Sequence, residues 1–152
     1  MTTPQTGESY ENLIEGLNDV IAIDYDAIEA YEAAIERLEN TSYQQQLETF
    51  KADHERHVRD LTDCVTMLGG EPREGADMKK LLTKGKVVLA NITGDEGILK
   101  AMKSNEDQTN KTYEDAVREY ANAPAQVKDA LQRGLSDERR HRDWIVQTLQ
   151  GH

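Results

Sequence analysis

At 152 residues, the chain is long enough for one domain that buries about two-thirds of the surface of its unfolded chain. Only 37% of its residues are hydrophobic and 5% aromatic, which suits a helical bundle with narrow apolar stripes, and no apolar run approaches the roughly 18 residues of a membrane span. The formal net charge of −11 excludes the basic face that nucleic-acid binding needs, and it argues against docking on anionic lipid.

Residues 1–8 are predicted to form a flexible tail, and they lack the basic and apolar regions of a signal peptide. Residues 9–150 are expected to form a single domain. Its first helix is predicted over residues 9–39, where apolar residues recur at the helical period. The sequence NTS then supplies a turn and an N-cap, and a second helix is predicted over residues 42–68. The single cysteine, Cys64, excludes an intramolecular disulfide and indicates a reducing compartment, so we expect a cytoplasmic protein.

The segment between residues 71 and 94 is too long for a tight turn and contains a short amphipathic stretch over residues 78–92. It is expected to cross the length of the domain and to carry a short helix. The sequence TGDE, a capping box with Thr93 as N-cap, predicts the start of a third helix over residues 95–121. A break at NAPAQ precedes a fourth helix, predicted over residues 124–149. The chain is therefore predicted to be an all-α four-helix bundle with a long crossover between its second and third helices.

Six ionisable residues fill gaps in the apolar stripes, so they are expected to face the axis of the bundle. They are Asp24 on the first predicted helix, His54 and His57 on the second, Glu106 on the third, and Glu138 and His141 on the fourth. Unpaired charges are costly to bury, so these groups must pair with something. Because three of the four histidines lie at these positions beside carboxylates, a bound metal ion is the favoured partner. The alternative is a metal-free polar core in which the carboxylates pair with His or Arg.

The two halves of the chain repeat one pattern. DHERH at residues 53–57 and DERRH at residues 137–141 share their first Asp and their last Arg-His pair. In each half an acidic residue also precedes a tyrosine by seven positions, Asp24 before Tyr31 and Glu106 before Tyr113. Within each predicted hairpin the acid and the histidines lie at matched distances from the turn, so each trio is expected to meet near the middle of the bundle.

With these motifs the chain resembles the ferritin-like superfamily, which includes rubrerythrins and bacterioferritins. GGEP after the second helix is also similar to a small uncharacterised bacterial branch of it. In that superfamily, the first and third helices each give a Glu, and the second and fourth each give Glu-x-x-His to two iron ions. The resemblance implies that four residues of this chain are metal ligands, because they match ligand positions of the superfamily. It implies a fifth ligand at Asp24, which stands in place of the usual Glu of the first helix. The four are His57, Glu106, Glu138 and His141.

His54 departs from the family, because it stands where the second helix has a Glu that bridges the two irons. Three carboxylates and three imidazoles remain, and this set could hold one ion well or two asymmetrically. The resemblance implies one or two iron ions as the cofactor, and nitrogen and oxygen ligands also suit zinc, copper or nickel.

The resemblance implies a metal-binding protein that oxidises Fe(II) with dioxygen or peroxide, acting as a ferroxidase or a peroxide-reducing enzyme. Two alternatives stay open: a non-catalytic zinc or copper carrier or sensor, and a metal-free helical stress or interaction protein. Relatives of this size pair through helix faces, so a homodimer or higher homo-oligomer is expected.

Several further residues have alternative interpretations in the sequence. Tyr31 and Tyr113 could hydrogen-bond to ligand carboxylates, act in redox chemistry, or simply pack with the hydroxyl group satisfied. Asp53 and Asp137 could orient ligands or lie on solvated helix faces. Cys64 is expected to be a small buried core residue.

Overall fold

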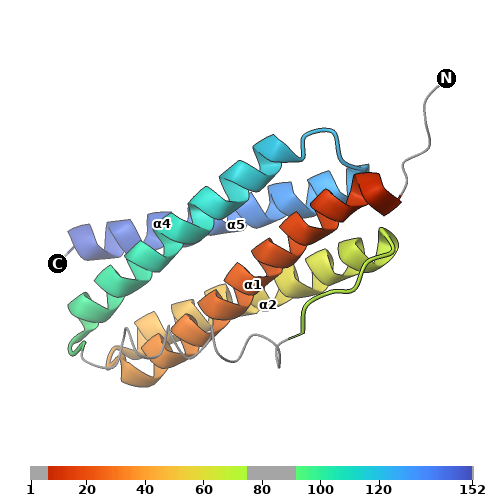
Figure 1. The fold of residues 1–152 in the computed structure, drawn as a ribbon. Coiled ribbons are helices and arrows are strands. Elements are labelled where there is room, and N and C mark those ends of the chain that lie inside the picture. The colour runs from red at the N-terminus through yellow and green to blue at the C-terminus, as the bar shows by residue number, and fades with distance from the viewer. Residues whose placement is uncertain (1–6, 75–91, 152) are drawn as a thin grey trace.

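Four long helices make up the described part of the computed structural model, which covers residues 7–74 and 92–151 (Figure 1). They are α1 (Gly7–Arg37), α2 (Thr41–Met67), α4 (Asp95–Glu119) and α5 (Ala125–Gln150). Each predicted boundary agrees with the structure to within two residues, and these ranges contain no strand. The prediction of an all-α four-helix bundle is confirmed. The short helix expected in the crossover, and most of the expected tail, lie outside the described residues.

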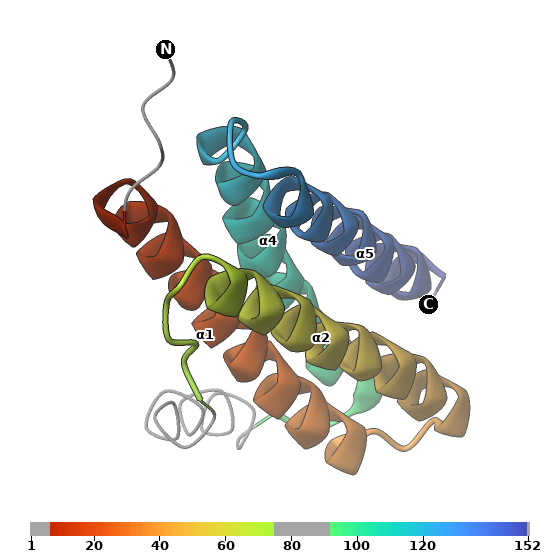
Figure 2. The same ribbon diagram turned by 90° about the vertical axis from the view of Figure 1, so that its right-hand side faces the viewer.

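The helices form two antiparallel hairpins, α1 with α2 and α4 with α5 (Figures 1 and 2). The hairpins pack with α1 against α4 and α2 against α5. The end of α2 and the start of α4 lie at opposite ends of the bundle, as the ribbon shows (Figure 1). This arrangement belongs to bundles in which a long connection, and not a tight turn, joins the second and third long helices. None of the four described helices has an apolar stretch of the kind that a lipid bilayer requires.

The start of α2 is capped in the turn that the sequence predicts, and its end is capped by a glycine. The Asn40 side chain accepts a hydrogen bond from the backbone N–H of Tyr43 at 3.1 Å, which satisfies one free donor of the first turn. At the other end, Gly69 adopts a φ of 88°, and the backbone N–H of Gly70 donates to the carbonyl of Val65 at 2.9 Å. Glycine supplies the left-handed conformation that this helix termination needs.

The start of α4 differs from its prediction, which placed Thr93 at the N-cap of a capping box. Gly94 holds the N-cap position with a φ of 84°, and no side chain bonds there. The Asp95 carboxylate instead accepts hydrogen bonds from the backbone N–H groups of Glu39 at 2.8 Å and Asn40 at 3.0 Å. The first turn of α4 is thereby tied to the turn between α1 and α2, a contact with the other hairpin that local sequence does not reveal.

Two apolar clusters fill the bundle and leave a polar layer between them. One cluster lies toward the end of the bundle that carries the turn between α4 and α5, and it includes Leu17, Ile21, Leu61, Val65 and Leu131. The other lies toward the end that carries the turn between α1 and α2, and it includes Phe50, Leu99, Met102 and Ile145. The polar layer is therefore shielded from water along the axis on both sides.

Gly134 on α5 makes room for the ring of Tyr113 on α4. A Cβ at position 134 would lie 2.9 Å from Cδ1 of Tyr113 and closer still to Cε1. Tyr113 is fully buried and its hydroxyl group is hydrogen-bonded to Asp24, so the ring cannot move aside. We expect Gly134→Ala to lower the free energy of unfolding by about 1–2 kcal/mol, because the overlap outweighs the better helix propensity of alanine.

Urea unfolding would measure this change, with Gly16→Ala as the matched control. A Cβ at Gly16 would overlap only the end of the Tyr120 side chain, which is half-buried and can turn toward solvent. The control should therefore be neutral or slightly stabilising. Equal stability of Gly134→Ala and the unsubstituted protein would contradict the packing described for Tyr113.

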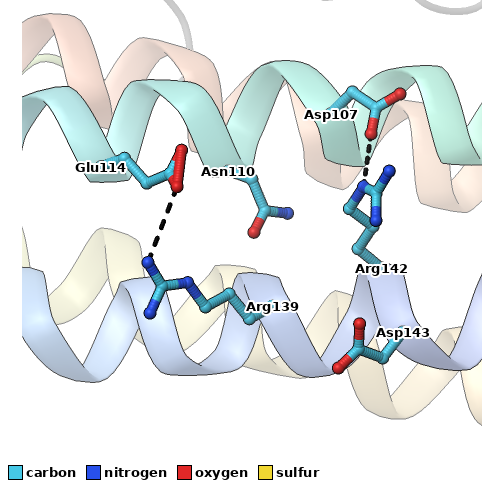
Figure 3. A pocket seen from close by; sticks show the side chains of 6 residues that line it. All are labelled: Asp107, Asn110, Glu114, Arg139, Arg142 and Asp143. Carbon is cyan, nitrogen blue, oxygen red and sulfur yellow. Dashed lines mark hydrogen bonds and ion pairs between the residues drawn. The ribbon is translucent and has the colours of Figure 1, made fainter.

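A pocket of about 350 Å³ opens on the outer face between α4 and α5 (Figure 3). Two ion pairs join the helices across it, Arg142 Nε to Asp107 Oδ1 at 2.5 Å and Arg139 Nη2 to Glu114 Oε2 at 3.6 Å. Asn110, only 8% exposed, lies between the two pairs (Figure 3). The lining of the pocket therefore includes one buried amide, that of Asn110.

Candidate metal centre

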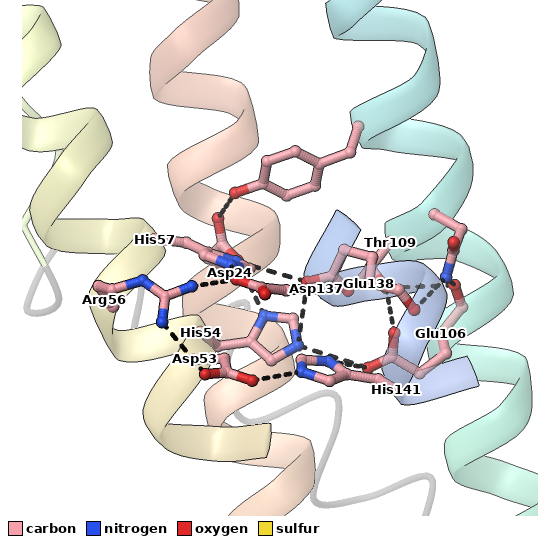
Figure 4. A network of polar contacts seen from close by, with 12 residues as sticks. Asp24, Asp53, His54, Arg56, His57, Glu106, Thr109, Asp137, Glu138 and His141 are labelled. Carbon is pink, nitrogen blue, oxygen red and sulfur yellow. Dashed lines mark hydrogen bonds and ion pairs between the residues drawn. The ribbon is translucent and has the colours of Figure 1, made fainter. Parts of the chain in front are cut away.

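All six residues predicted to face the bundle axis lie together in the polar layer (Figure 4). None of them is more than 3% exposed. They come from all four helices and are Asp24, His54, His57, Glu106, Glu138 and His141. The structure therefore places the two trios, one from each hairpin, at the same height in the bundle.

The six side chains form two overlapping sets of four potential metal ligands. One set is Asp24, His54, His57 and Glu138, and the other is His54, Glu106, Glu138 and His141. Within each set, one ligand atom of each residue lies within 4.8 Å of the others. Because His54 and Glu138 belong to both sets, the layer offers two neighbouring places for an ion with two shared side chains.

The first set is centred on the Asp24 carboxylate. Its Oδ1 atom lies 2.8 Å from Nδ1 of His54 and 3.2 Å from Nδ1 of His57. Oε1 of Glu138 lies 3.4 Å from the same His57 nitrogen. Burial alone would raise the pKa of Asp24, but its hydrogen bonds with the two histidines outweigh burial and lower it. Asp24 is thus a charged carboxylate with imidazole nitrogens on one side.

The second set is centred on the Glu106 carboxylate. Its Oε2 atom lies 3.3 Å from Nδ1 of His141 and 3.4 Å from Nε2 of His54. Oε1 of Glu138 lies 3.3 Å from the same His54 nitrogen. Burial opposes ionisation of Glu106, but hydrogen bonds with His141 and His54 hold its pKa well below the usual range. The two sets therefore repeat one arrangement of a terminal carboxylate and a terminal histidine.

The outer nitrogens of two histidines bond to carboxylates of the opposite hairpin. Nε2 of His57 lies 2.9 Å from Asp137 Oδ2, and Nε2 of His141 lies 2.8 Å from Asp53 Oδ2. Asp53 and Asp137 therefore do not lie on solvated faces; they orient the two imidazole rings. With Nε2 donating outward, Nδ1 of each ring is the atom left to bind a metal ion.

Two arginines hold these carboxylates in turn. Arg140 bonds to Asp53 at 2.9 Å and to Asp137 at 2.8 Å. Arg56 bonds to Asp53 at 3.2 Å and makes a shorter contact with Asp137. Burial would raise the pKa of Asp137, but its hydrogen bonds with His57 and Arg140 hold it well below the usual range. The four charges, two from α2 and two from α5, alternate in sign over the outer side of the histidines. Figure 4 shows three of them, Asp53, Arg56 and Asp137.

Tyr31 and Tyr113 each donate a hydrogen bond to an acid of the opposite hairpin. The Tyr113 hydroxyl group bonds to Asp24 Oδ2 at 2.6 Å, and the Tyr31 hydroxyl group bonds to Glu106 Oε2. Each tyrosine lies seven positions after the acid of its own helix, which is about 10 Å along the axis and too far for a hydrogen bond. It therefore bonds to the acid of the neighbouring antiparallel helix. Burial and the nearby carboxylates raise the pKa of both tyrosines, which keeps them as donors.

Two further residues of α4 support the centre, and the sequence analysis did not single them out. Thr109 Oγ1 donates to Glu106 Oε1 at 3.1 Å. The Asn110 amide donates to the backbone carbonyls of Glu106 at 2.7 Å and of Glu138 at 3.0 Å. Their spacing of three and four residues from Glu106 was the available signal, since such residues share a helix face.

Cys64 is not part of the centre. It is fully buried in the apolar cluster near the turn between α4 and α5, and its Sγ atom lies 3.8 Å from the carbonyl of Gln126. Burial raises the pKa of the thiol to about 11, so the thiolate that binds metals is scarce at neutral pH.

Glu138 differs from the other five residues in its hydrogen bonding. Within residues 7–74 and 92–151, neither of its carboxylate oxygens has a hydrogen-bond partner, although both are buried. Burial, together with the charge of Glu106, raises its pKa well above the ordinary value despite the nearby His54. Oε1 has only the ion-pair contacts with His54 and His57 described above, and a buried polar group without a hydrogen bond costs about 1–3 kcal/mol. Cations on either side would give both oxygens a partner, so the donor set of three carboxylates and three imidazoles fits a metal centre.

Comparison with known proteins supports this architecture. A crystal structure described as "ferritin like, diiron-carboxylate proteins from Bacillus anthracis str. Ames" matches with a TM-score of 0.72 and 22% sequence identity. The match covers 91% of this chain and 96% of that chain, and it shows that the fold is ferritin-like, as the sequence predicted. Among curated proteins, no match is found. The family model described as "Domain of unknown function (DUF2383)" matches residues 12–119, most of the chain, which therefore belongs to this family.

Proposed function

We propose that this protein binds iron at the polar layer and promotes the oxidation of Fe(II) by dioxygen or peroxide. The observation that carries the proposal is the buried Glu138 carboxylate, which faces both ligand sets and lacks a hydrogen-bond partner among the described residues. The similar crystal structure is described as a diiron-carboxylate protein, which supports iron as the metal and a capacity for two ions.

In this proposal each hairpin supplies the terminal ligands of one ion. Asp24 and His57 hold the first ion, and Glu106 and His141 hold the second. The iron would supply the electrons that reduce the oxidant, a capacity that carboxylates and imidazoles lack. The chain's own residues fix the ligands in place, and the two apolar clusters keep bulk water away from them.

Metal analysis of tag-free protein, followed by anaerobic Fe(II) titration and exposure to air, tests the proposal. We expect up to two Fe(II) ions per chain, and oxidation faster than in buffer without protein. Glu114→Gln, at a surface ion pair outside the layer, is a control that should behave like the unsubstituted protein. Protein that retains no metal would show that the layer is a metal-free polar core, as expected of a helical stress or interaction protein.

A second candidate function is a zinc or copper carrier or sensor. It is favoured by His54, which gives the layer a third imidazole in place of a carboxylate and so suits ions that prefer nitrogen. Tight binding of zinc or copper, without oxidation of Fe(II), would support this function over the first. The homodimer or higher homo-oligomer stays a prediction, and light scattering against the chain mass of 17.2 kDa would test it.

Replacement of Asp53 or Asp137 by alanine is expected to weaken metal binding by about 10–100-fold, although neither residue belongs to a ligand set. Each carboxylate orients one histidine, and without it the ring can turn its Nδ1 atom away. Competition with a chromophoric chelator would measure the affinity. Asp60→Ala is the matched control. It also removes an aspartate of α2, but one that pairs with two arginines, Arg56 and Arg133, and not with a histidine of the layer. Unchanged affinity in both variants would contradict the positioning role.

A further inference from the structure

His54 lies between the two ligand sets with a ring nitrogen toward each (Figure 4). Its Nδ1 atom is 2.8 Å from Asp24 Oδ1 in the first set. Its Nε2 atom is 3.4 Å from Glu106 Oε2 and 3.3 Å from Glu138 Oε1 in the second set. The ring is fully buried, so neither nitrogen faces solvent.

The other two histidines of the layer are placed differently. His57 and His141 each direct Nε2 outward to an aspartate, Asp137 and Asp53 respectively, and each offers only Nδ1 to the interior. His54 has no such outward partner, since both of its nitrogens face carboxylates that belong to the ligand sets. His57 and His141 can therefore each serve one ion, whereas the position of His54 allows it to serve two.

We infer that His54 joins the two sites as a shared ligand, with Nδ1 toward the ion held by Asp24 and Nε2 toward the ion held by Glu106. This inference rests on the proposed metal binding and deepens it. In a neutral imidazole, one nitrogen has a lone pair that can bind a metal ion, and the other nitrogen carries a proton. Each ring nitrogen that binds an ion releases any proton it carries to solvent, a nitrogen–metal bond replaces the N–H bond, and no electron is transferred.

Two consequences follow from a shared imidazole ring. The ions would interact through the bonds of the ring, so their unpaired electrons would be coupled. The centre would also have two kinds of shared ligand, the carboxylate of Glu138 and the ring of His54. Removal of one should leave the other in place, which allows the two contributions to be separated.

Cupric ion is a suitable probe, because each Cu(II) has one unpaired electron and binds imidazole and carboxylate readily. Metal-free protein would be loaded with one and then two Cu(II) per chain, and the spins counted by electron paramagnetic resonance. We expect one spin per copper at the first equivalent and well below one spin per copper at the second. In His54→Gln the coupling through the ring is lost, so the spin count at two coppers should rise above that of the unsubstituted protein, with only the Glu138 carboxylate still shared. In Glu138→Gln the coupling should remain.

The spin count of the unsubstituted protein tests whether the two ions are coupled, even if a variant folds poorly. Circular dichroism would check the fold of each variant. A full spin count with two coppers bound would overturn the shared role of His54 and leave the proposed function standing. A spin count at two coppers that is the same in folded His54→Gln as in the unsubstituted protein would overturn it in the same way. Failure of the unsubstituted protein to bind Cu(II) or Fe(II) would overturn both this inference and the proposed function.

Discussion

Saturation with Fe(II) under anaerobic conditions is expected to raise the melting temperature of the protein by about 8–16 °C. An ion at about a thousand times its Kd stabilises the native state by about 4 kcal/mol, and each kcal/mol is worth about 2–4 °C for a domain of this size. The effect should be large because the six side chains come from all four helices, so unfolding separates them completely. Scanning calorimetry with and without the ion would measure it.

A variant without the terminal histidines tests whether this stabilisation arises at the centre. The double substitution of His57 and His141 by alanine removes one nitrogen ligand from each set, and the Fe(II)-dependent rise should disappear. Addition of a chelator to the loaded unsubstituted protein should return its melting temperature to the metal-free value. An unchanged melting temperature with Fe(II) in the unsubstituted protein would argue against a metal centre.

Glu138→Leu is expected to stabilise the metal-free protein and to abolish its response to iron. The buried carboxylate lacks a hydrogen-bond partner within the described residues, and a leucine of similar volume would remove a cost of about 1–3 kcal/mol. The same substitution removes the ligand that both sets share, so added Fe(II) should no longer raise the melting temperature. The stability in the metal-free state and the response to metal would therefore change in opposite directions.

Asp24→Leu is the matched comparison for this prediction. Asp24 is as buried as Glu138, but it accepts hydrogen bonds from Tyr113 and contacts His54 and His57. Its removal leaves those groups without their acceptor, so the metal-free protein should lose about 3–5 kcal/mol of stability. Urea unfolding of both variants in chelator would measure the difference. A loss of stability in Glu138→Leu as large as that in Asp24→Leu would show that Glu138 is well partnered without a metal.

The helices and the inward residues could be predicted because their signals are local. Apolar positions three and four residues apart mark the buried face of a helix, and a polar residue at such a position must point the same way. His54 and His57 were located by that rule alone, and both are buried in the structure. The start of α2 followed from the N-cap signal in NTS at residues 40–42, whose effect is confined to a single turn.

The contacts between hairpins could not be predicted in the same way, because they depend on how far one hairpin slides along the other. Asp53 remained open between a solvated face and a role in orientation, since its partner His141 lies 88 positions away in sequence. Asp95 was interpreted as part of a local capping motif, whereas its carboxylate bonds to the turn between α1 and α2.

The repeated motif contained a signal for these contacts. Asp53 and Asp137 hold the same place in DHERH and DERRH, and the seven-residue interval between acid and tyrosine occurs in both halves. If the halves are related by an approximate two-fold axis, each group that cannot reach a partner in its own hairpin should find one in the other. The two tyrosines follow this rule, as Tyr31 bonds to Glu106 and Tyr113 bonds to Asp24.

The exchange of partners between hairpins also fixes their register. A slip of one helical turn, about 5.4 Å, would separate both tyrosine–acid pairs and both histidine–aspartate pairs at once. Apolar clusters built from leucine and valine tolerate such a slip more readily, because hydrophobic contacts have no fixed direction. The polar layer therefore selects one alignment among several that the apolar clusters alone would permit, and this selection acts before any ion is bound.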